Sequence, residues 1–365
     1  MTTTDAAAAV LARTRFSVLD RSRTRTGQDP AQSLRDTVRF AQQVEALGYH
    51  RFWVSEHHSV PGVAGSAPTV LAAAVAAATS TIRVGTGGVM LPNHQPLVVA
   101  EQFGVLDALY PGRIDMGLGR SVGFTGGVRK ALGHGKDDAE DFAGQLELLL
   151  GYLTGTQTAH PQVHAYPAEG RRVPPFVLAM GEGADIAAGA GLPLVIGDLR
   201  GRSRMTEAVE RYRDGFKPSV WAEEPYVMIA GEVAVAETAE AARRLLIPEA
   251  WSMAYSRTHG VFPPLEPVEA TLARELSPKE RDLFESGLRG KLYGTEDEVR
   301  TALAEVITAT GADEVLVTTS TYDRDELLNS FTRLMSAMGP PSARGQLAAG
   351  AQLSAGGATV SPSGV

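Results

Sequence analysis

The chain has 365 residues, of which 44% are hydrophobic and 21% are charged, and its formal net charge is −8. This composition excludes a chain that is disordered over most of its length, and the acidic excess argues against nucleic-acid binding, because phosphate neutralisation needs Lys and Arg. The sequence has no cysteine, which excludes disulfides, thiolate zinc sites and thiol nucleophiles.

The two ends differ in composition from the region between them. Residues 1–13 are rich in Thr and Ala, and residues 339–365 are mostly Gly, Ala, Ser and Pro, so we expect flexible extensions at both ends. Residues 14–338 are expected to form a single domain. No apolar run approaches the roughly 18 residues of a membrane span, and no secretory signal is recognised, so we expect a cytoplasmic protein that does not contact membranes.

Between these extensions, short β-branched segments alternate with helical patterns. Strands are expected at 16–20, 51–54, 82–91, 113–118, 176–178, 194–196, 226–229 and 315–318. Helices are expected at 34–47, with Ser33 and Asp36 as its cap, and at 69–78, 97–109, 295–310 and 325–338. The helix expected at 295–310 begins with the capping box Thr295-x-x-Glu298 and ends at Gly311.

Eight such alternations predict an α/β fold, a (β/α)8 TIM barrel, with an open doubly wound sheet as the alternative. Barrels of this kind carry their chemistry at the carboxyl ends of the strands. Residues 256–289, which follow the seventh strand, do not fit the repeat and contain several prolines. This insertion is a candidate lid over the site, and a surface excursion without a special role is the alternative.

Histidines follow the second strand, in Glu56-His57-His58. Imidazole suits proton transfer near neutral pH, so His57 and His58 are candidate catalytic residues, although either can be a hydrogen-bonded structural histidine. Only one of two adjacent side chains in an extended segment can face the barrel mouth. No metal site is predicted, since no His-Glu-x-x-His pattern is present.

Glycines cluster at two other strands. Gly85-Thr86-Gly87-Gly88 lies inside the third strand, where glycine marks a bend or a ligand close to the backbone. Residues 117–123 follow the fourth strand and include Arg120, a combination that suits a phosphate, and Arg129 and Lys130 come soon after. The glycine spacing is not that of the dinucleotide-binding pattern, and a solvated basic loop is the alternative.

Taken together, these segments resemble the bacterial luciferase-like family of flavin-dependent monooxygenases, and within it the subgroup from antibiotic pathways. The resemblance rests on "LGYHRFWVSEHH" and on "IRVGTGGVMLPNHQPLVVAEQFGVLDALYPGRIDMGLGR", with looser likeness in "AAGAGLPLVIGD" and "GADEVLVTTST". It covers residues 16–338 and implies a TIM barrel that uses reduced FMN and O2. The family's C4a-peroxyflavin chemistry would then oxygenate a small organic substrate, such as an aromatic polyketide.

The resemblance also implies roles for individual residues. His57 matches the family's catalytic histidine, with His58 beside it, and Gly87 and Gly88 match a non-prolyl cis peptide beside the flavin. Met90 lies in the same cofactor-binding segment. Arg120 matches a phosphate-binding arginine, and Lys130 or Arg129 a second basic ligand.

One turn departs from the family pattern. Relatives have a Ser- or Thr-rich phosphate turn after the fifth strand, whereas this chain has Met180-Gly181-Glu182-Gly183, in which only the backbone N–H groups of Gly181 and Gly183 can donate. This departure fits transient use of reduced FMN better than tight binding of oxidised FMN.

Partners and alternative functions follow from the same resemblance. We expect a separate flavin reductase, and a homodimer that pairs through the early helices around residues 68–78. The alternatives are an F420-dependent hydride-transfer oxidoreductase, a non-catalytic flavin-binding protein, and a barrel enzyme without flavin.

Overall fold

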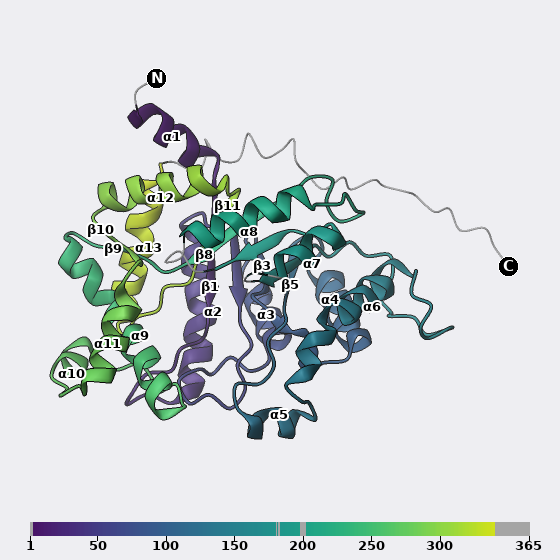
Figure 1. Cartoon of the computed structure of the whole chain (residues 1–365), viewed down its shortest axis with the longest axis horizontal. Coiled ribbons are helices and arrows are strands. Elements are labelled where there is room, and N and C mark those ends of the chain that lie inside the picture. Colours follow the sequence, from purple (N-terminus) through teal and green to yellow (C-terminus); the bar gives the residue numbers. More distant parts are fainter. Residues whose placement is uncertain (1–2, 180, 182, 198–201, 340–365) are drawn as a thin grey trace.

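The computed structural model describes residues 3–179, 181, 183–197 and 202–339 of the chain. Parallel strands form a closed barrel at its centre, and helices surround them (Figure 1). The strands are β1 (Arg15–Asp20), β2 (Arg51–Val54), β3 (Arg83–Thr86), β4 (Val89–Met90), β5 (Ile114–Gly119), β6 (Pro175–Ala179), β7 (Leu194–Ile196), β8 (Val227–Gly231), β9 (Val233–Val235), β10 (Leu292–Gly294) and β11 (Glu314–Val317). The α-helices are α1 (Thr3–Arg13), α2 (Pro30–Ala46), α3 (Pro68–Ala78), α4 (Pro96–Leu109), α5 (Gly126–Leu132), α6 (Phe142–Thr154), α7 (Gly183–Ala190), α8 (Arg202–Asp214), α9 (Ala239–His259), α10 (Val268–Leu272), α11 (Pro278–Leu288), α12 (Glu296–Thr310) and α13 (Arg324–Ala337). Two 3-10 segments, η1 (Leu91–Asn93) and η2 (Asp137–Asp141), complete the elements.

The strand order confirms the (β/α)8 barrel and excludes the open sheet. Neighbours run β3-β2-β1-β11-β8-β7-β6-β5-β4, and a further β3–β5 pairing closes the circle. All these pairings are parallel, and the first strand of the chain pairs with the last, with Phe16 opposite Val315. The strand expected over 82–91 is divided into β3 and β4, which count as one barrel strand, and Gly87 and Gly88 lie between them.

Helix boundaries follow local capping chemistry. At α12 the predicted capping box is present: the Thr295 side chain accepts from the Glu298 backbone, and the Glu298 side chain accepts from the Thr295 backbone. The cap expected at Ser33 and Asp36 is wrong, because α2 begins one turn earlier. Asp29 accepts from the Ala31 backbone, and Pro30 occupies the first helical position, where its missing N–H costs nothing.

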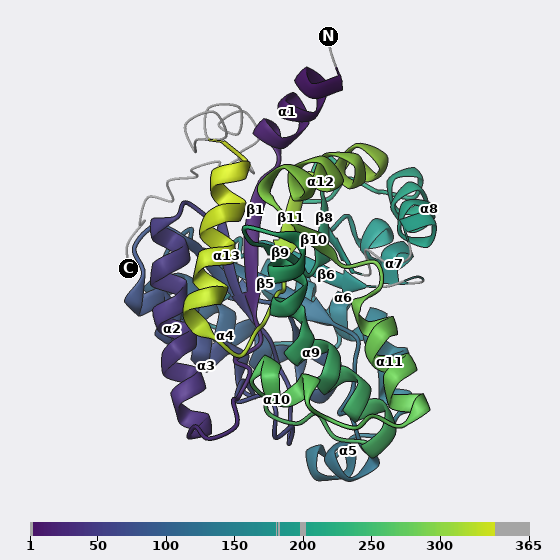
Figure 2. The ribbon, with the colours of Figure 1, turned by 90° about the vertical axis from the view of Figure 1, so that its left-hand side faces the viewer.

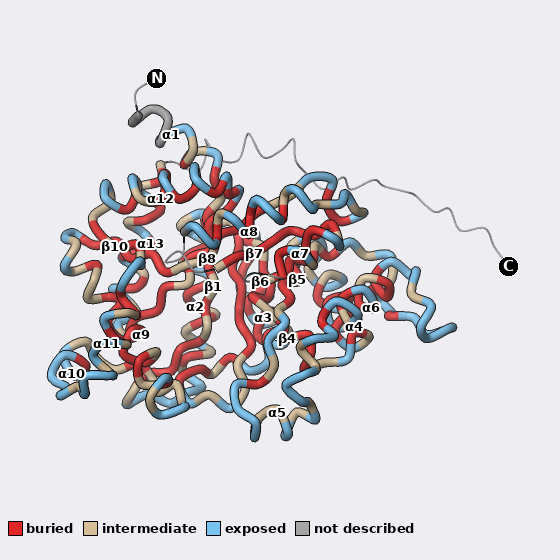
Figure 3. Tube along the Cα trace, in the orientation of Figure 1, coloured by how far each residue is buried: buried red, intermediate tan, exposed pale blue. Residues whose placement is uncertain are grey.

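The barrel interior has an apolar layer and a charged layer. Trp53, Phe176, Val195, Met228 and Leu316 pack together inside the strands, which are buried along most of their length (Figure 3). In the charged layer, Arg51 lies between two buried carboxylates. It donates from Nη1 to Asp115 Oδ2 at 2.8 Å and from Nε to both oxygens of Glu314 at 3.1 Å.

Residues 256–289, the candidate lid, belong to a larger ordered insertion. The short strands β9 and β10 pair with each other, and α9, α10 and α11 lie together beside the barrel (Figure 2). Their apolar residues form a second core, in which Trp251, Leu246 and Phe284 are buried. The insertion is therefore a helical layer with its own core rather than an irregular excursion, and its role as a lid stays a prediction.

The structure describes most of the N-terminal segment but little of the C-terminal one. The N-terminal extension was expected to be flexible; in the structure residues 3–13 form α1, which packs against α12 and buries Leu11. Most of the predicted C-terminal tail, residues 340–365, lies outside the described residues. Within the part of the chain that the structure describes, no helix has the length and apolar character needed to cross a membrane.

Candidate active site

A cavity of about 600 Å³ opens at the carboxyl ends of the barrel strands. Every barrel strand or the loop after it contributes to its wall. The lining residues are Leu19, Ser55, Glu56, His57, Gly87, Gly88, Met90, Gly119, Arg120, Ser121, Leu178, Ala179, Val195, Gly197, Ala230 and Leu316. This is where sequence reasoning places the chemistry of such barrels, and the volume suits a cofactor-sized molecule.

One wall of the cavity is backbone with little side chain. The Gly87–Gly88 peptide is cis, as the family resemblance implied. A Cβ added at Gly88 would lie 2.8 Å from the carbonyl oxygen of Gly117, so only glycine fits there. Elsewhere in the cavity lining, after β7, a Cβ at Gly197 would meet no described atom within 4 Å. A flat ring can therefore approach the backbone closely along this wall.

His57 is held at the cavity by two contacts. Its Nδ1 lies 3.1 Å from Ser55 Oγ, and its backbone N–H donates to the carbonyl of Gly65 at 2.9 Å. Burial, together with the neighbouring positive charges of Arg21 and Arg23, lowers the pKa of His57 to about 4. The imidazole is thus neutral at pH 7 and can accept a proton.

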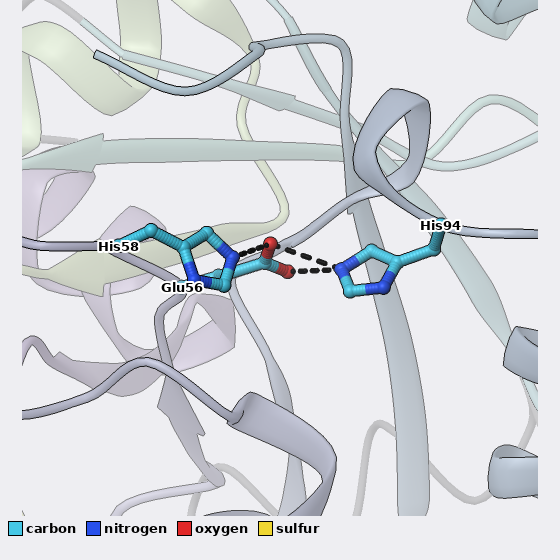
Figure 4. A group of neighbouring side chains, drawn as sticks. All are labelled: Glu56, His58 and His94. Atoms are coloured by element: carbon cyan, nitrogen blue, oxygen red, sulfur yellow. Dashed lines mark hydrogen bonds and ion pairs between the residues drawn. The ribbon is translucent and has the colours of Figure 1, made fainter. Parts of the chain in front are cut away.

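His58 points to a different set of groups. The carboxylate of Glu56 lies between the rings of His58 and His94 (Figure 4), whose Nε2 atoms are 2.7 and 3.0 Å from Glu56 Oε1. Glu56 Oε2 also accepts from the backbone N–H of Met90 at 2.9 Å. Burial alone would raise the pKa of Glu56, but these hydrogen bonds hold it below its ordinary value.

The same three residues are the kind that bind metals. One ligand atom from each of Glu56, His58 and His94 lies within 4.8 Å of the others. However, the two rings approach the carboxylate from either side in Figure 4. Each ring therefore makes its own hydrogen bond to Glu56, and the three residues do not point toward one shared position. The cluster ties the end of β2 to Met90 in β4.

A second buried charged group lies beside His57. Glu249, from α9, lies 3.0 Å from Arg21 Nη1 and 3.0 Å from Arg23 Nε. Burial alone would raise the pKa of Glu249, but the two guanidinium groups hold it below its ordinary value. Through these two ion pairs of Glu249, the insertion contacts the loop that follows β1.

The structure brings together part of the predicted site. His57, Gly87, Gly88, Met90 and Arg120 all line the cavity.

The other predicted site residues are not among the described lining residues. His58 turns to Glu56, and Arg129 donates to the carbonyl of Gly123 at 2.8 Å. Lys130 is exposed in the last turn of α5, Gly181 is exposed, and Gly183 is the buried first residue of α7. Met180 and Glu182, which complete the divergent turn, lie outside the described residues.

Sequence reasoning also missed residues at the site. Gly197 directly follows a predicted strand, so the rule that barrels act at strand ends could have found it. Ser121 lies within residues 117–123, which were predicted to suit a phosphate, but no role was predicted for Ser121 itself. The same rule, together with the alternation of Arg21, Arg23 and Arg25 after the first strand, could have drawn attention to the arginines. Glu249 carries no such local signal.

Comparisons with known proteins give the same family as the motifs. The family model for luciferase-like monooxygenases matches residues 14–314. The luciferase-like monooxygenase of Escherichia coli (strain K12) is 34% identical over 324 residues, which cover 88% of this chain and 96% of that protein. The N-acetyl-S-alkylcysteine monooxygenase of Bacillus subtilis (strain 168) is 43% identical over 155 residues, covering 42% of this chain and 46% of that protein.

Solved structures show the same barrel. The crystal structure of apo-MsnO8 superposes with a TM-score of 0.80 at 32% identity, covering 90% of this chain and 98% of that one. At 16% identity, the fold is also shared by the FMN complex of a 3,6-diketocamphane monooxygenase component and by an F420-dependent secondary alcohol dehydrogenase. The strand order, the cavity at the strand ends and these matches agree, and the chain belongs to the luciferase-like monooxygenase family.

Proposed function

We propose that this protein is the oxygenase of a two-component monooxygenase, which takes reduced FMN from a separate reductase and uses O2 to oxygenate a small organic substrate. The observation that carries the proposal is the cavity itself, in which bare backbone at Gly87–Gly88, a basic group at Arg120 and a neutral His57 share one space. The FMN complex of a protein with the same fold supports a flavin as the cofactor.

The cavity residues have the chemical groups that the phosphate and the ring of FMN require. Arg120 and Ser121 follow β5 and supply a guanidinium and a hydroxyl for the phosphate. The glycine wall leaves room for the isoalloxazine ring. Leu19, Leu178 and Leu316 provide apolar surface across the cavity floor. When bound, reduced FMN would supply the electrons and the oxygen chemistry, which no side chain can provide.

The protein itself would bind and orient the cofactor and the substrate, and would move one proton. We assign proton acceptance from substrate or cofactor to His57, because its imidazole is neutral at pH 7 and Ser55 fixes the ring. The apolar floor and the insertion beside Arg21 and Arg23 would limit the access of water. His58 would act with Glu56 in holding Met90 rather than in proton transfer.

The test is oxygen uptake with purified protein, NADH, FMN and an unrelated flavin reductase, with hydrogen peroxide measured in parallel. Stopped-flow absorbance would follow the oxidation of reduced FMN by O2 with and without the protein. We expect the protein to slow this oxidation and to lower peroxide release. Oxidation at the rate of free flavin would contradict the proposal, and a titration with F420 would then test the hydride-transfer alternative.

His57→Ala separates catalysis from binding. The variant should lose turnover by roughly 10²–10⁴-fold, as expected for a proton-transfer group, while its affinity for reduced FMN stays close to that of the wild type. His58→Ala is the matched control, since His58 neighbours His57 but hydrogen-bonds to Glu56. Unchanged turnover in His57→Ala would contradict the role that we assign to His57.

We also propose a homodimer. Val70 on α3 and Val98, Val105 and Leu109 on α4 are exposed large apolar side chains on two helices that contact each other. Such a face is typical of a protein–protein contact. Size-exclusion chromatography with light scattering should give twice the chain mass, and Val105→Lys should shift the protein towards monomer. A monomer mass for the wild type at micromolar concentration would contradict the proposal.

A further inference from the structure

Three segments of the chain meet in one junction at the barrel mouth. They are residues 21–26 after β1, residues 55–66 after β2 and residues 261–266 after α9. Backbone contacts join them: β-bridges link the first segment to the other two, and the Gly62 N–H donates to the Phe262 carbonyl at 2.9 Å. The junction therefore ties the insertion to two loops of the barrel.

The side chain of Arg23 is buried in this junction, with 3% of its surface exposed. Nη1 donates to the carbonyl of Gly62 at 3.0 Å, and Nη2 donates to Ser252 Oγ at 2.5 Å and to the carbonyl of Pro263 at 3.4 Å. Nε lies 3.0 Å from Glu249 Oε2. One guanidinium thus contacts the loop after β2, the segment after α9 and α9 itself.

The loop that Arg23 holds also carries His57. The backbone N–H of His57 donates to the carbonyl of Gly65 at 2.9 Å, and Gly65 follows Gly62 by three residues. A Cβ added at Gly62 would overlap the carbonyl oxygen of Pro263, so the loop lies against the insertion without room for a side chain. The position of the His57 backbone therefore depends on how this loop is held.

We propose that Arg23 is a positioning residue for His57: by fixing the loop after β2 to the insertion, its guanidinium holds the imidazole at the cavity. His57 lines the cavity, whereas Arg23 is not among the described lining residues, so Arg23 acts only through another residue. This inference rests on the proposed function for its meaning, since that function assigns proton transfer to His57.

The charge of Arg23 supports the same role. The charged groups that face His57 are Arg21 and Arg23 from the loop after β1, Glu249 from α9, and Glu56 from its own loop. Burial and the two arginines lower the pKa of His57, and the two carboxylates raise it. Without Arg23 the balance moves towards the carboxylates, so the pKa of His57 should rise from about 4.

The test follows the imidazole signals of the full-length protein by NMR after carbon-13 labelling of histidine, between pH 8 and pH 5 and without flavin. His57 and His50 are assigned from variants in which each is replaced by Gln. His50 is the internal control, because burial lowers its pKa to about 4 as well. Its charged neighbours Glu314 and Arg51 begin β11 and β2, at the opposite end of the barrel.

The wild type is compared with Arg23→Met, Arg23→Lys and Arg25→Met. Arg25 is the matched control, because it is a buried arginine of the same loop. Its side chain donates to the backbone carbonyls of Arg23, Thr321 and Tyr322 and, among the described residues, to none in the loop after β2.

In the wild type and in Arg25→Met, both signals should stay at the position of neutral imidazole down to about pH 5. In Arg23→Met, the His57 signal should be displaced already at pH 8, because the loop is no longer fixed, and should titrate with a pKa raised by about one unit. Arg23→Lys should displace the signal at pH 8, because one ammonium cannot replace the fork of donors, but should leave the pKa near that of the wild type. The His50 signal should stay the same in every variant.

An Arg23→Met protein that folds and keeps the wild-type signal and titration of His57 would overturn the proposal. A displacement of His50 as large as that of His57 would overturn it too, since it would report a general loss of structure. Circular dichroism and thermal melting establish that each variant is folded. If Arg23→Met does not fold, Arg23→Lys decides, and an unchanged His57 signal in that variant overturns the proposal.

The NMR result is separate from the oxygenase assay, because no flavin is present. A displaced His57 signal in a protein that leaves the oxidation of reduced FMN unchanged supports the role of Arg23 and contradicts the proposed function. An unchanged signal in a protein that slows this oxidation removes the role of Arg23, and the proposed function stands.

Discussion

Replacing Arg51 by Met tests the charged layer inside the barrel. The side chain is buried and contacts both Asp115 and Glu314, and its Cζ lies 4.9 Å from the ring centre of Phe176. Methionine keeps most of the length but removes the charge and every hydrogen bond. Because two carboxylates would stay buried with fewer partners, we expect the free energy of unfolding at pH 7 to fall by about 3–5 kcal/mol.

The pH dependence of the free energy of unfolding gives an independent value for the stabilisation by these ion pairs. Burial alone would raise the pKa of Asp115, but Arg51 and Arg83 lower it from the ordinary 3.8 to about 2. This lowering of the pKa corresponds to roughly 2 kcal/mol of stability. Since the folded pKa lies below the unfolded one, this stabilisation is present above pH 4 and is lost as the pH falls towards 2. The deficit of Arg51→Met should therefore narrow between pH 7 and pH 3.

The assay is urea unfolding followed by circular dichroism at pH 7, 5 and 3. Arg39→Met is the control, because Arg39 is exposed on α2 and pairs only with Asp36 among the described residues, at 3.3 Å. That variant should differ from the wild type by about 0.5 kcal/mol or less. A loss below about 1 kcal/mol in Arg51→Met, or a loss that is the same at pH 7 and pH 3, would refute the reasoning.

Three further predictions concern the cavity. If His57 accepts a proton, turnover should fall only as the pH drops through about 4, where the imidazole becomes protonated; a pH–rate profile with its acidic limb near 6.5 would contradict this. Gly197→Val should weaken FMN binding, measured by fluorescence quenching, by roughly tenfold or more with little change in melting temperature, because Gly197 lines the cavity and a Cβ there would meet no described atom within 4 Å; unchanged affinity would place the flavin elsewhere. Glu56→Gln should lower the free energy of unfolding by about 1–3 kcal/mol, since an amide cannot accept from His58, His94 and the Met90 backbone together; a neutral effect in urea unfolding would show that the cluster contributes nothing.

The elements of the barrel could be predicted because their signals are local. A strand covered by helices on one side and by barrel contents on the other is apolar throughout, and the run 194–196 is buried at each residue. Thr295 and Glu298 mark the start of α12 because the cap lies within one turn. The predicted start of α2 was wrong because the first turn of this helix is polar. The apolar stripe, from which the start was predicted, begins only at Leu34, whereas the helix begins at Pro30.

The insertion and part of the site could not be predicted in this way. The apolar residues of α9 and α11 face each other as well as the barrel, and Pro248 lies within α9, so the sequence shows neither a clean stripe nor an uninterrupted helix. His94 and Glu249 become site residues only through contacts made across the fold. Their position depends on tertiary packing, which one sequence without its structure does not contain.

The pairing of β1 with β11 has a consequence for the order in which the protein is made. Residues 314–317 are added to the growing chain about 300 residues after residues 15–20. At 5–20 residues per second, this interval lasts roughly 15–60 s. Throughout it, one edge of β1 lacks its final neighbour and Arg51 lacks Glu314. During this interval the nascent chain therefore presents an unpaired edge of β1, and residues 314–317 complete both the barrel and the wall of the cavity.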